Sequence, residues 1–227
     1  MRNVEGKNPV IELIKEGKEV EKIYLQKGLR GDKIKLILEM AEENNIYLEW
    51  LPKFKIDEKA VTDNHQGVIA LTSEIETYDL YEIIDSLENK DDPLILILDH
   101  IQDPHNFGAI IRTAHAAGVD AIIYPKDRAC SITATVDKVS AGAIEHVNLV
   151  EVLNINRAID VLKEKYYWIV GADINGEQNY FEHDFEGKYA LVLGHEGSGL
   201  ARLTKEKCDF LVKIPMQKEF SSLNVSV

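Results

Sequence analysis

Apolar residues recur at two different spacings along the chain, and these spacings predict helices and strands in turn. We expect helices where apolar side chains return every three or four positions, and strands where they are continuous or alternate with polar ones. In the first third the pattern predicts a helix at 8–17 closed by Gly17, a strand at 20–25, a helix at 32–44 with Asp32 as its N-cap, a strand at 46–51, a helix at 57–62 and a β-branched strand at 67–72. These elements make an alternating α/β unit of the size of a small domain.

The rest of the chain continues the alternation. The pattern predicts helices at 79–90, 105–117, 134–141, 155–165 and 200–207, and strands at 94–99, 121–125, 147–152, 167–173, 189–194 and 210–215. Continuous apolar strands such as 94–98 are typical of a parallel sheet covered on both faces. We therefore predict the α/β class, with a small N-terminal α/β domain and a larger domain built on a parallel sheet.

An acidic segment at 73–92 separates the two parts. It contains one amphipathic stretch, in which Leu80, Ile83, Ile84 and Leu87 recur at helical spacing. We interpret this segment as a linker that runs into the first helix of the second domain. The predicted domains are residues 1–75 and 76–227.

Composition places the chain among ordinary globular proteins, with 45% hydrophobic and 29% charged residues in 227. No apolar run reaches half of the about 18 residues that a membrane span requires, so no membrane association is expected. Acidic residues stand where a secretory signal has its apolar region, and we expect a cytoplasmic protein. Cys130 and Cys208 have no CxxC partner, so neither a disulfide framework nor a cysteine-based zinc site is expected.

The formal charge of −13 is unusual for a protein that binds nucleic acid, because phosphate binding normally shows as a surplus of basic residues. The deficit is uneven. Residues 1–75 hold 12 Lys and Arg against 14 Asp and Glu, whereas residues 76–227 hold 14 against 25. Any nucleic-acid contact is therefore expected mainly in the N-terminal third.

The first stretch with candidate chemistry follows the predicted strand at 94–99. Asn106 and Arg112 lie at a strand-to-helix junction, the edge at which open α/β sheets bind ligands. The alternative is that Asn106 caps a helix and Arg112 is a solvated surface charge. Histidines and carboxylates at 99–105 raise the question of a metal site, but they lack the single-face spacing of a helical ligand pair, and no metal is predicted.

Two further stretches join strand ends to polar turns. Residues 191–200 are a strand entering a turn with Gly194, Gly197 and Gly199, which match neither the dinucleotide pattern GxGxxG nor a P-loop. Glu196 in this turn is either a helix cap or a polar anchor for a ligand. Residues 213–216 and 221–227 follow, where Ser222 reads first as a helix N-cap.

Taken together, the segments NFGAIIRTA, LGHEGSGL, IPM and SSLNVSV resemble, in order, the three motifs of SpoU-type (TrmH-like) RNA ribose 2′-O-methyltransferases of the SPOUT class. The front of the chain, with VEGKNPVIEL and HQGVIA, is similar to the RNA-binding domain of members that methylate a guanosine in large-subunit ribosomal RNA. The resemblance implies a trefoil knot in the C-terminal domain and a homodimer formed through it. In the family a final helix follows SSLNVSV, and this sequence ends at Val227.

The resemblance also implies the site residues. The catalytic RNA site would contain Asn106, Arg112, Glu196, Ser222 and Asn224, and the cofactor S-adenosylmethionine would be lined by Gly194, Ile214, Met216 and Leu223. We expect Arg112 to clamp a phosphate and stabilise the developing alkoxide rather than act as a base, because a guanidinium stays protonated in proteins. Asn106 would orient the ribose or Arg112, with Glu196 holding the network.

The resemblance implies methyl transfer from S-adenosylmethionine to a ribose 2′-hydroxyl of RNA, with ribosomal RNA as the partner. Three alternatives remain at this point: the same chemistry on tRNA, a structured-RNA-binding module without turnover, and a small-molecule nucleotide-binding enzyme. The intact motifs disfavour the module. The absence of a phosphate loop in the sequence disfavours the small-molecule enzyme.

Overall fold

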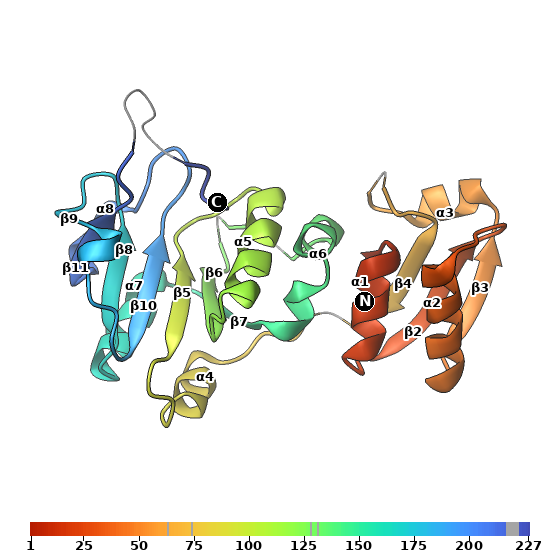
Figure 1. Ribbon diagram of the computed structural model, residues 1–227, viewed down its shortest axis with the longest axis horizontal. Helices are drawn as coiled ribbons and strands as arrows, with labels where there is room; N and C mark the ends of the chain where they lie inside the picture. The colour runs from red at the N-terminus through yellow and green to blue at the C-terminus, as the bar shows by residue number, and fades with distance from the viewer. Residues whose placement is uncertain (63, 74, 128, 131, 217–222) are drawn as a thin grey trace. The chain divides into compact units, whose positions relative to one another are not determined.

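The computed structural model describes residues 1–62, 64–73, 75–127, 129–130, 132–216 and 223–227 (Figure 1). The chain forms two compact units. Unit 1 contains Met1–Ile75 together with Ile132–His146, and unit 2 contains Glu76–Ser131 and Val147–Val227. The break near residue 75 agrees with the change in pattern at the acidic segment, whereas the inclusion of Ile132–His146 in unit 1 has no counterpart in the sequence pattern.

Unit 1 is built on a four-stranded sheet with the order β1-β4-β2-β3. Its N-terminal elements are β1 (Arg2–Glu5), α1 (Lys7–Lys15), β2 (Val20–Gln26), α2 (Asp32–Glu43), β3 (Tyr47–Leu51), α3 (Lys53–Lys59) and β4 (Val68–Thr72). β4 is antiparallel to both β1 and β2, while β2 and β3 are parallel. The main core lies on one face, where α1 and α2 bury Val10, Leu13, Ile34 and Ile37 against the sheet. α3 covers part of the other face through Ile56.

Three details of unit 1 differ from the sequence expectation. β1 was not predicted, because four residues are too few for a clear period. The helix predicted at 57–62 is wrong: α3 begins at Lys53, directly after Pro52, whose carbonyl accepts the N–H groups of Lys55 and Ile56. The predicted N-cap at Asp32 is also wrong, because Gly31 occupies the cap and Asp32 is the first helical residue.

The segment Ile132–His146 packs in unit 1 through a buried charge cluster. It contains α6 (Ala134–Ser140) and the 3₁₀ helix η1 (Ala143–His146). Arg2 of β1 forms ion pairs with Asp137 and Glu145, whose side chains are only 3% and 5% exposed. Buried carboxylates are tolerated when paired in this way, so Arg2 holds the segment to the edge of the sheet.

Unit 2 is built on a seven-stranded sheet with the order β7-β6-β5-β10-β8-β11-β9, and every pair in it is parallel. Its elements are α4 (Leu80–Ser86), β5 (Leu94–Leu98), α5 (Pro104–Ala116), β6 (Ala121–Pro125), β7 (Asn148–Val152), α7 (Ile155–Glu164), β8 (Trp168–Ala172), β9 (Gln178–Asn179), the 3₁₀ helix η2 (Tyr180–Glu182), β10 (Tyr189–Leu193), α8 (Arg202–Lys207) and β11 (Phe210–Lys213). The predicted parallel sheet is confirmed, and β9 and η2 are additions that the pattern did not indicate.

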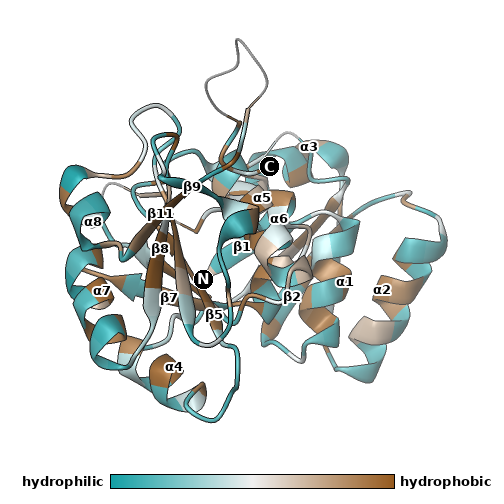
Figure 2. Ribbon diagram, turned by 60° about the vertical axis from the view of Figure 1, so that its left-hand side comes forward, coloured by the Kyte–Doolittle hydropathy of each residue, from teal (hydrophilic) through white to brown (hydrophobic). Residues whose placement is uncertain are grey.

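Helices cover both faces of this sheet, as its continuous apolar strands require. On one face α4 and α7 bury their apolar sides against Ile95, Ile97 and Ile169. On the other face α5 packs through Phe107, whose ring lies 5.3 Å from that of Tyr124 of β6. In Figure 2 the strands β5 and β8 are largely brown, whereas α8 is largely teal. Among the described helices none is both long and apolar enough to traverse a bilayer.

Both cysteines are packed against the protein rather than exposed. Cys130 is buried, and Cys208 is half-buried against the core of unit 2. Burial raises the pKa of each thiol to about 11. At neutral pH both therefore remain protonated and unreactive.

The Arg2 cluster gives a prediction about stability. Arg2→Ala leaves two buried carboxylates unpaired and should lower the free energy of unfolding by about 3 to 5 kcal/mol at neutral pH. Urea denaturation measures the change, with the exposed Arg30→Ala as a control that should change stability by less than about 0.5 kcal/mol. Equal effects of the two variants would contradict the assignment.

The same cluster predicts a pH dependence. Burial raises the pKa of Asp137 to about 6, although Arg2 acts in the opposite direction. A raised carboxyl pKa contributes stability that is fully present below about pH 4 and is lost as the pH rises through about 6. Asp137 is therefore mainly ionised, and in need of a pairing cation, only above about pH 6. The destabilisation by Arg2→Ala should grow between pH 4 and pH 7.

Candidate active site

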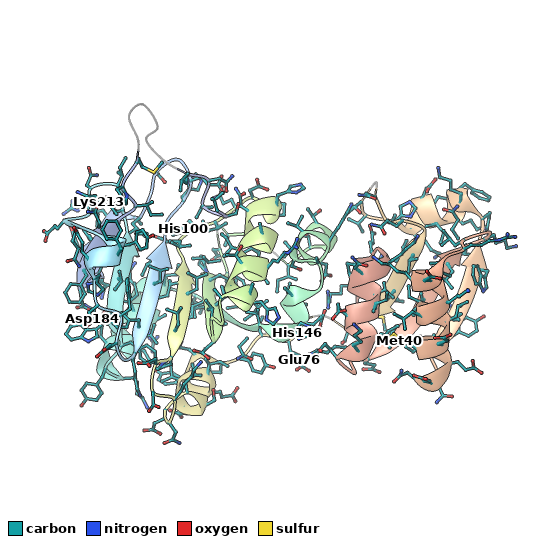
Figure 3. All side chains as sticks on the ribbon, in the orientation of Figure 1. Met40, Glu76, His100, His146, Asp184 and Lys213 are labelled. Carbon is teal, nitrogen blue, oxygen red and sulfur yellow. The ribbon has the colours of Figure 1, made fainter. Side chains whose placement is uncertain are left out.

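The candidate site lies where two neighbouring parallel strands end. β5 and β10 pair in register, with Leu98 opposite Leu193, so the loops that follow them leave the sheet at the same edge. The N–H of Asp99 donates to the carbonyl of Leu193 at 2.8 Å and extends this pairing by one residue. Segments far apart in the sequence therefore meet at the edge where open α/β sheets bind ligands. Figure 3 labels His100 at this end of the sheet.

Asp99 fastens the two loops together. Its side chain is 1% exposed, and its Oδ2 accepts the N–H of Ala201 at 2.8 Å, while Oδ1 bonds His100 Nδ1. A buried carboxylate is costly unless it is hydrogen-bonded, and here two bonds satisfy it. Asp103 caps α5 by accepting the N–H of His105 at 2.9 Å. Within the described residues no group of three or more histidines, cysteines and carboxylates could hold a metal ion.

The glycine turn after β10 closes on itself. His195 and Gly199 exchange backbone hydrogen bonds of 3.0 and 2.8 Å, and the His195 ring accepts the N–H of Gly197 at 3.0 Å. A Cβ on Gly194 would lie 2.3 Å from the carbonyl carbon of Gly199. Gly194 is therefore required by the turn's own backbone.

Asn106 and Glu196 are brought together across the two loops. Asn106 lies in the first turn of α5 and is 7% exposed, and its Nδ2 donates to Glu196 Oε1. Because Asp103 caps the helix, Asn106 is not the N-cap that the alternative interpretation required. Glu196 binds a side chain of the first motif instead of capping a helix. The amide is thus held in one orientation beside a carboxylate.

The third motif reaches the same point. Ser226 Oγ donates to Asn106 Oδ1 at 3.3 Å and contacts Asn224 Oδ1 at 2.7 Å, and the Ser226 N–H donates to the same Asn224 oxygen at 2.9 Å. Asn224 is therefore linked to Asn106 through Ser226. Ser222 lies outside the described residues.

Arg112 occupies a different face of α5. Six residues of an α-helix correspond to a rotation of about 120° from the starting face and about 9 Å along the axis. Arg112 is exposed on that face, whereas Asn106 points into the contact with Glu196. The structure thus brings Asn106, Glu196 and Asn224 into one network and leaves Arg112 to the side of it.

The remaining predicted residues lie at the same edge of the sheet. Ile214 and Met216 follow β11, which is separated from β10 only by β8, so they leave the sheet on the same side as Gly194. Ile214 and Leu223 expose their apolar side chains to solvent. A pocket of about 360 Å³ lies between the β5 and β10 loops, lined by Asp99, His100, Gln102, His195, Ser198, Gly199 and Ala201.

The arrangement can bind a polar group and hold it still. A buried amide fixed by a carboxylate on one side and a hydroxyl on the other keeps its orientation without a ligand, which lowers the cost of positioning a substrate. Two residues of the site were not identified from the sequence: Asp99, which joins the β5 and β10 loops, and Ser226, which links Asn224 to Asn106. Ser226 has a sequence signal, because Ser222, Asn224 and Ser226 recur at every second position.

Comparison with known families decides what the site belongs to. The model of the "SpoU rRNA Methylase family" matches residues 93–227, and the model of "RNA 2′-O ribose methyltransferase substrate binding" matches residues 3–78. The chain belongs to the SpoU methylase family. The resemblance carried by the three motifs is confirmed, and the SpoU match covers the whole network of Asn106, Glu196 and Ser226.

Relatives of the SpoU family match the chain over nearly its full length. The protein named "Putative TrmH family tRNA/rRNA methyltransferase YacO" of Bacillus subtilis (strain 168) is 40% identical over 98% of this chain and 89% of its own length. A relative named in the same way from Staphylococcus haemolyticus is 43% identical over the same shares.

Solved structures agree with the fold. The SpoU methyltransferase AviRb from Streptomyces viridochromogenes is 25% identical, with a TM-score of 0.83 over 99% of this chain and 84% of that chain. The A. aeolicus TrmH/SpoU tRNA modifying enzyme is 29% identical, with a TM-score of 0.55 over 65% of this chain and 75% of that chain.

A double-mutant cycle tests the hydrogen bond between Asn106 and Glu196. Asn106→Ala and Glu196→Ala, alone and combined, should show a coupling of about 1 kcal/mol in the free energy of unfolding, because hydrogen bonds to charged groups are strong but Glu196 is exposed to competing water. The control pair is Arg202 and Glu206, an exposed helical ion pair that should couple by less than about 0.5 kcal/mol. Additive effects at Asn106 and Glu196 would contradict the pairing.

The glycine turn offers a matched pair of substitutions. Gly194→Ala forces a Cβ against backbone atoms and should lower the free energy of unfolding by about 1 to 3 kcal/mol. Gly197→Ala meets only the His195 ring at 3.7 Å and should be nearly neutral. Thermal or urea unfolding of the two variants distinguishes them, and similar losses would show that the turn opens more easily than its geometry indicates.

Proposed function

We propose that this protein transfers the methyl group of S-adenosylmethionine to a ribose 2′-hydroxyl of RNA, and that the target is a guanosine in large-subunit ribosomal RNA. The observation that carries the proposal is the network of Asn106, Glu196, Asn224 and Ser226, in which all three motifs of the family meet. Membership of the SpoU methylase family supports the reaction class.

The residues at this edge fit the proposed cofactor. The SpoU methyltransferase AviRb has been solved in complex with AdoMet. In this chain, the main chain of Ile214 and Met216 lies just beyond the last ladder pair of β11, and the apolar side chains of Ile214 and Leu223 are available to cover an adenosine. Gly194 shapes the opposite wall by keeping its turn closed. S-adenosylmethionine would supply an activated methyl group on a sulfonium.

The chain's own residues have to align the ribose and deal with its proton. In the proposed mechanism Asn106 orients the ribose through its fixed amide, and Glu196 on one side and Ser226, bonded to Asn224, on the other hold that amide in place. Arg112, exposed and permanently charged, clamps a phosphate next to the target and stabilises the developing alkoxide. The proton leaves through that phosphate or through water.

Unit 1 is proposed to dock the RNA. The match to the substrate-binding model, residues 3–78, covers nearly all of its N-terminal part, and residues 1–75 carry nearly balanced charge, whereas the rest of the chain is acidic. The tRNA modifying enzyme of A. aeolicus aligns with only 65% of this chain, and this partial match supports ribosomal RNA over tRNA. A homodimer formed through unit 2 belongs to the proposal and is checked by analytical ultracentrifugation.

Incubation with tritiated S-adenosylmethionine tests the function directly. Label should enter large-subunit ribosomal RNA, and mapping should place it on the 2′-oxygen of a guanosine. Label in tRNA alone would replace the proposed substrate but keep the reaction. RNA binding without label would support the non-catalytic module, and neither binding nor label would overturn the proposal.

Arg112 allows the clamp and the base to be distinguished. A guanidinium holds a phosphate through two parallel charge-assisted hydrogen bonds, whereas lysine supplies a point charge. Loss of such bonds, about 1.5 to 3 kcal/mol, corresponds to a rate lowered about 10- to 150-fold. Arg112→Ala should lose this much or more in single-turnover methylation, and Arg112→Lys should keep a measurable part. The exposed Arg157→Ala is the control and should be unchanged.

The pH profile of the lysine variant decides between the two roles. If Arg112 only clamps, the rate of Arg112→Lys relative to wild type should stay constant or fall as the pH approaches the lysine pKa of about 10.4, because the charge is lost. A relative rate that climbs with pH would instead identify the side chain as the base. Full activity of Arg112→Ala would remove the residue from the mechanism.

A further inference from the structure

Unit 2 carries an exposed patch of aromatic and acidic residues that the proposed reaction does not use. We name it the aromatic-acidic patch and define it by the aromatic residues Trp168, Tyr180, Phe181 and Phe185 and the carboxylates of Glu177, Glu182, Asp184 and Glu186. The four aromatic residues are between 42% and 62% exposed. Exposed aromatic groups gathered in one place mark interaction surfaces in soluble proteins.

Two of the exposed rings, Phe185 and Trp168, pack against other aromatic rings. Phe185 packs on His183 at 4.8 Å and on Tyr189 at 5.3 Å between ring centroids, and His183 packs on Phe210 at 4.6 Å. Trp168 joins the same row by lying 5.5 Å from Phe210. Trp168 and Phe185 therefore extend a partly buried aromatic cluster, and a partner would find these two rings already positioned at little entropic cost.

The loop that carries most of the patch is also fixed at its start. η2 is closed by a reciprocal cap, in which the Asn179 N–H donates to Glu182 Oε2 at 2.9 Å. Gln178 Nε2 lies 2.7 Å from His183 Nδ1 and anchors the next turn. The protein thus holds Tyr180 and Phe181 in water, where their rings contact each other edge to face at 5.4 Å.

The patch extends from the beginning of β8 and β10, where Trp168 and Phe185 lie, to the end of β11, beside which Tyr180 and Phe181 lie. Trp168, Tyr189 and Phe210 are the first residues of β8, β10 and β11, whereas the site follows the last residues of β5 and β10. Figure 3 labels Asp184 at one end of these strands and His100 at the other. Tyr180 and Phe181, by contrast, follow β9, whose Asn179 pairs with Lys213 at the end of β11, so these two rings lie at the same edge of the sheet as the candidate site.

Charge indicates what binds there. Residues 177–188 hold four carboxylates and one lysine. The carboxylates of Asp184 and Glu186 act on the phenol of Tyr189, whose pKa burial raises and both charges raise further. RNA phosphates would be repelled by such a surface. Arginine and lysine side chains would instead stack on the rings and pair with the carboxylates.

We propose that the aromatic-acidic patch binds an extended, arginine- and lysine-rich segment of a protein that is bound to the RNA substrate. The inference rests on the proposed function, and it narrows the substrate from naked RNA to a ribonucleoprotein particle. The inference also gives a role to the excess of acidic residues in 76–227. This negative charge repels RNA phosphates, but it attracts the basic proteins that are bound to RNA.

Binding can be followed through Trp168 in the full chain. Trp50→Phe removes the other tryptophan, so that emission reports on the patch alone. The probe is a short synthetic peptide alternating arginine and glycine, with a glutamine–glycine peptide and a single-stranded RNA oligonucleotide as comparisons. We expect a saturable change in emission with the arginine peptide only. A change of equal affinity with the RNA would overturn the inference and make the patch an RNA surface.

A matched pair of charge variants separates the patch from the net charge of the protein. Glu177→Gln/Asp184→Asn/Glu186→Gln should weaken binding of the arginine peptide about tenfold, since three exposed ion pairs are lost. Glu39→Gln/Glu42→Gln/Glu43→Gln in α2 removes the same charge from exposed positions elsewhere and should leave the affinity unchanged. Equal weakening by both variants would show attraction to overall charge and would overturn the inference.

Activity assays connect the patch to the substrate. With naked ribosomal RNA the patch variant should methylate at the wild-type rate, whereas with precursor ribosomal particles its kcat/KM should fall about tenfold. Equal rates on both substrates would overturn the inference while leaving the proposed function intact. Absence of methylation of any RNA by the wild type would overturn the proposed function, and peptide binding at Trp168 would then stand by itself.

Discussion

The parallel pairing of β5 with β10 is the constraint on which the rest of unit 2 depends. It is a pairing of strands far apart in the sequence, and it sends two loops off one edge of the sheet in adjacent positions. Asp99 makes the junction firm by joining the end of β5 to Ala201 beyond the glycine turn. Without this register Asn106 and Glu196 would not meet, because they come from separate loops.

The glycine turn shows how a structural and a functional requirement fall on the same residue. Gly194 must be glycine because Gly199 crosses directly over it, whatever else the turn binds. A closed turn presents Glu196 to Asn106 and forms a wall of the pocket beside Asp99. The backbone geometry is therefore the means by which the polar network is set, and the proposed cofactor wall follows from the same closure.

The negative charge of the chain is unevenly distributed, which leaves one part of an acidic protein able to contact RNA phosphates. The N-terminal third is nearly balanced, and the acidic surplus belongs to the rest. Within unit 2 a dense group of carboxylates lies among the aromatic residues of 177–186, next to the edge strand β9 and separate in the strand order from β5 and β10, whose ends carry the Asn106–Glu196 contact. In unit 1 the carboxylates of Asp137 and Glu145 are instead buried and paired, and the single cation of Arg2 neutralises both and holds Ile132–His146 in the unit.

The sequence alone determined the α/β class, the parallel sheet, most elements and the family, because local period and motif order are written in neighbouring residues. It placed Asn106 and Glu196 in the right motifs but could not show that they touch, since strand register is a long-range property. α3 was misplaced because Pro52 outweighed the weak apolar period after it. Only the tertiary structure assigned Ile132–His146 to unit 1, gave Asp99 and Ser226 their contacts, and placed Trp168 on the aromatic cluster that also holds Phe185. Each of these depends on which distant segments pack together, and no local pattern encodes that choice.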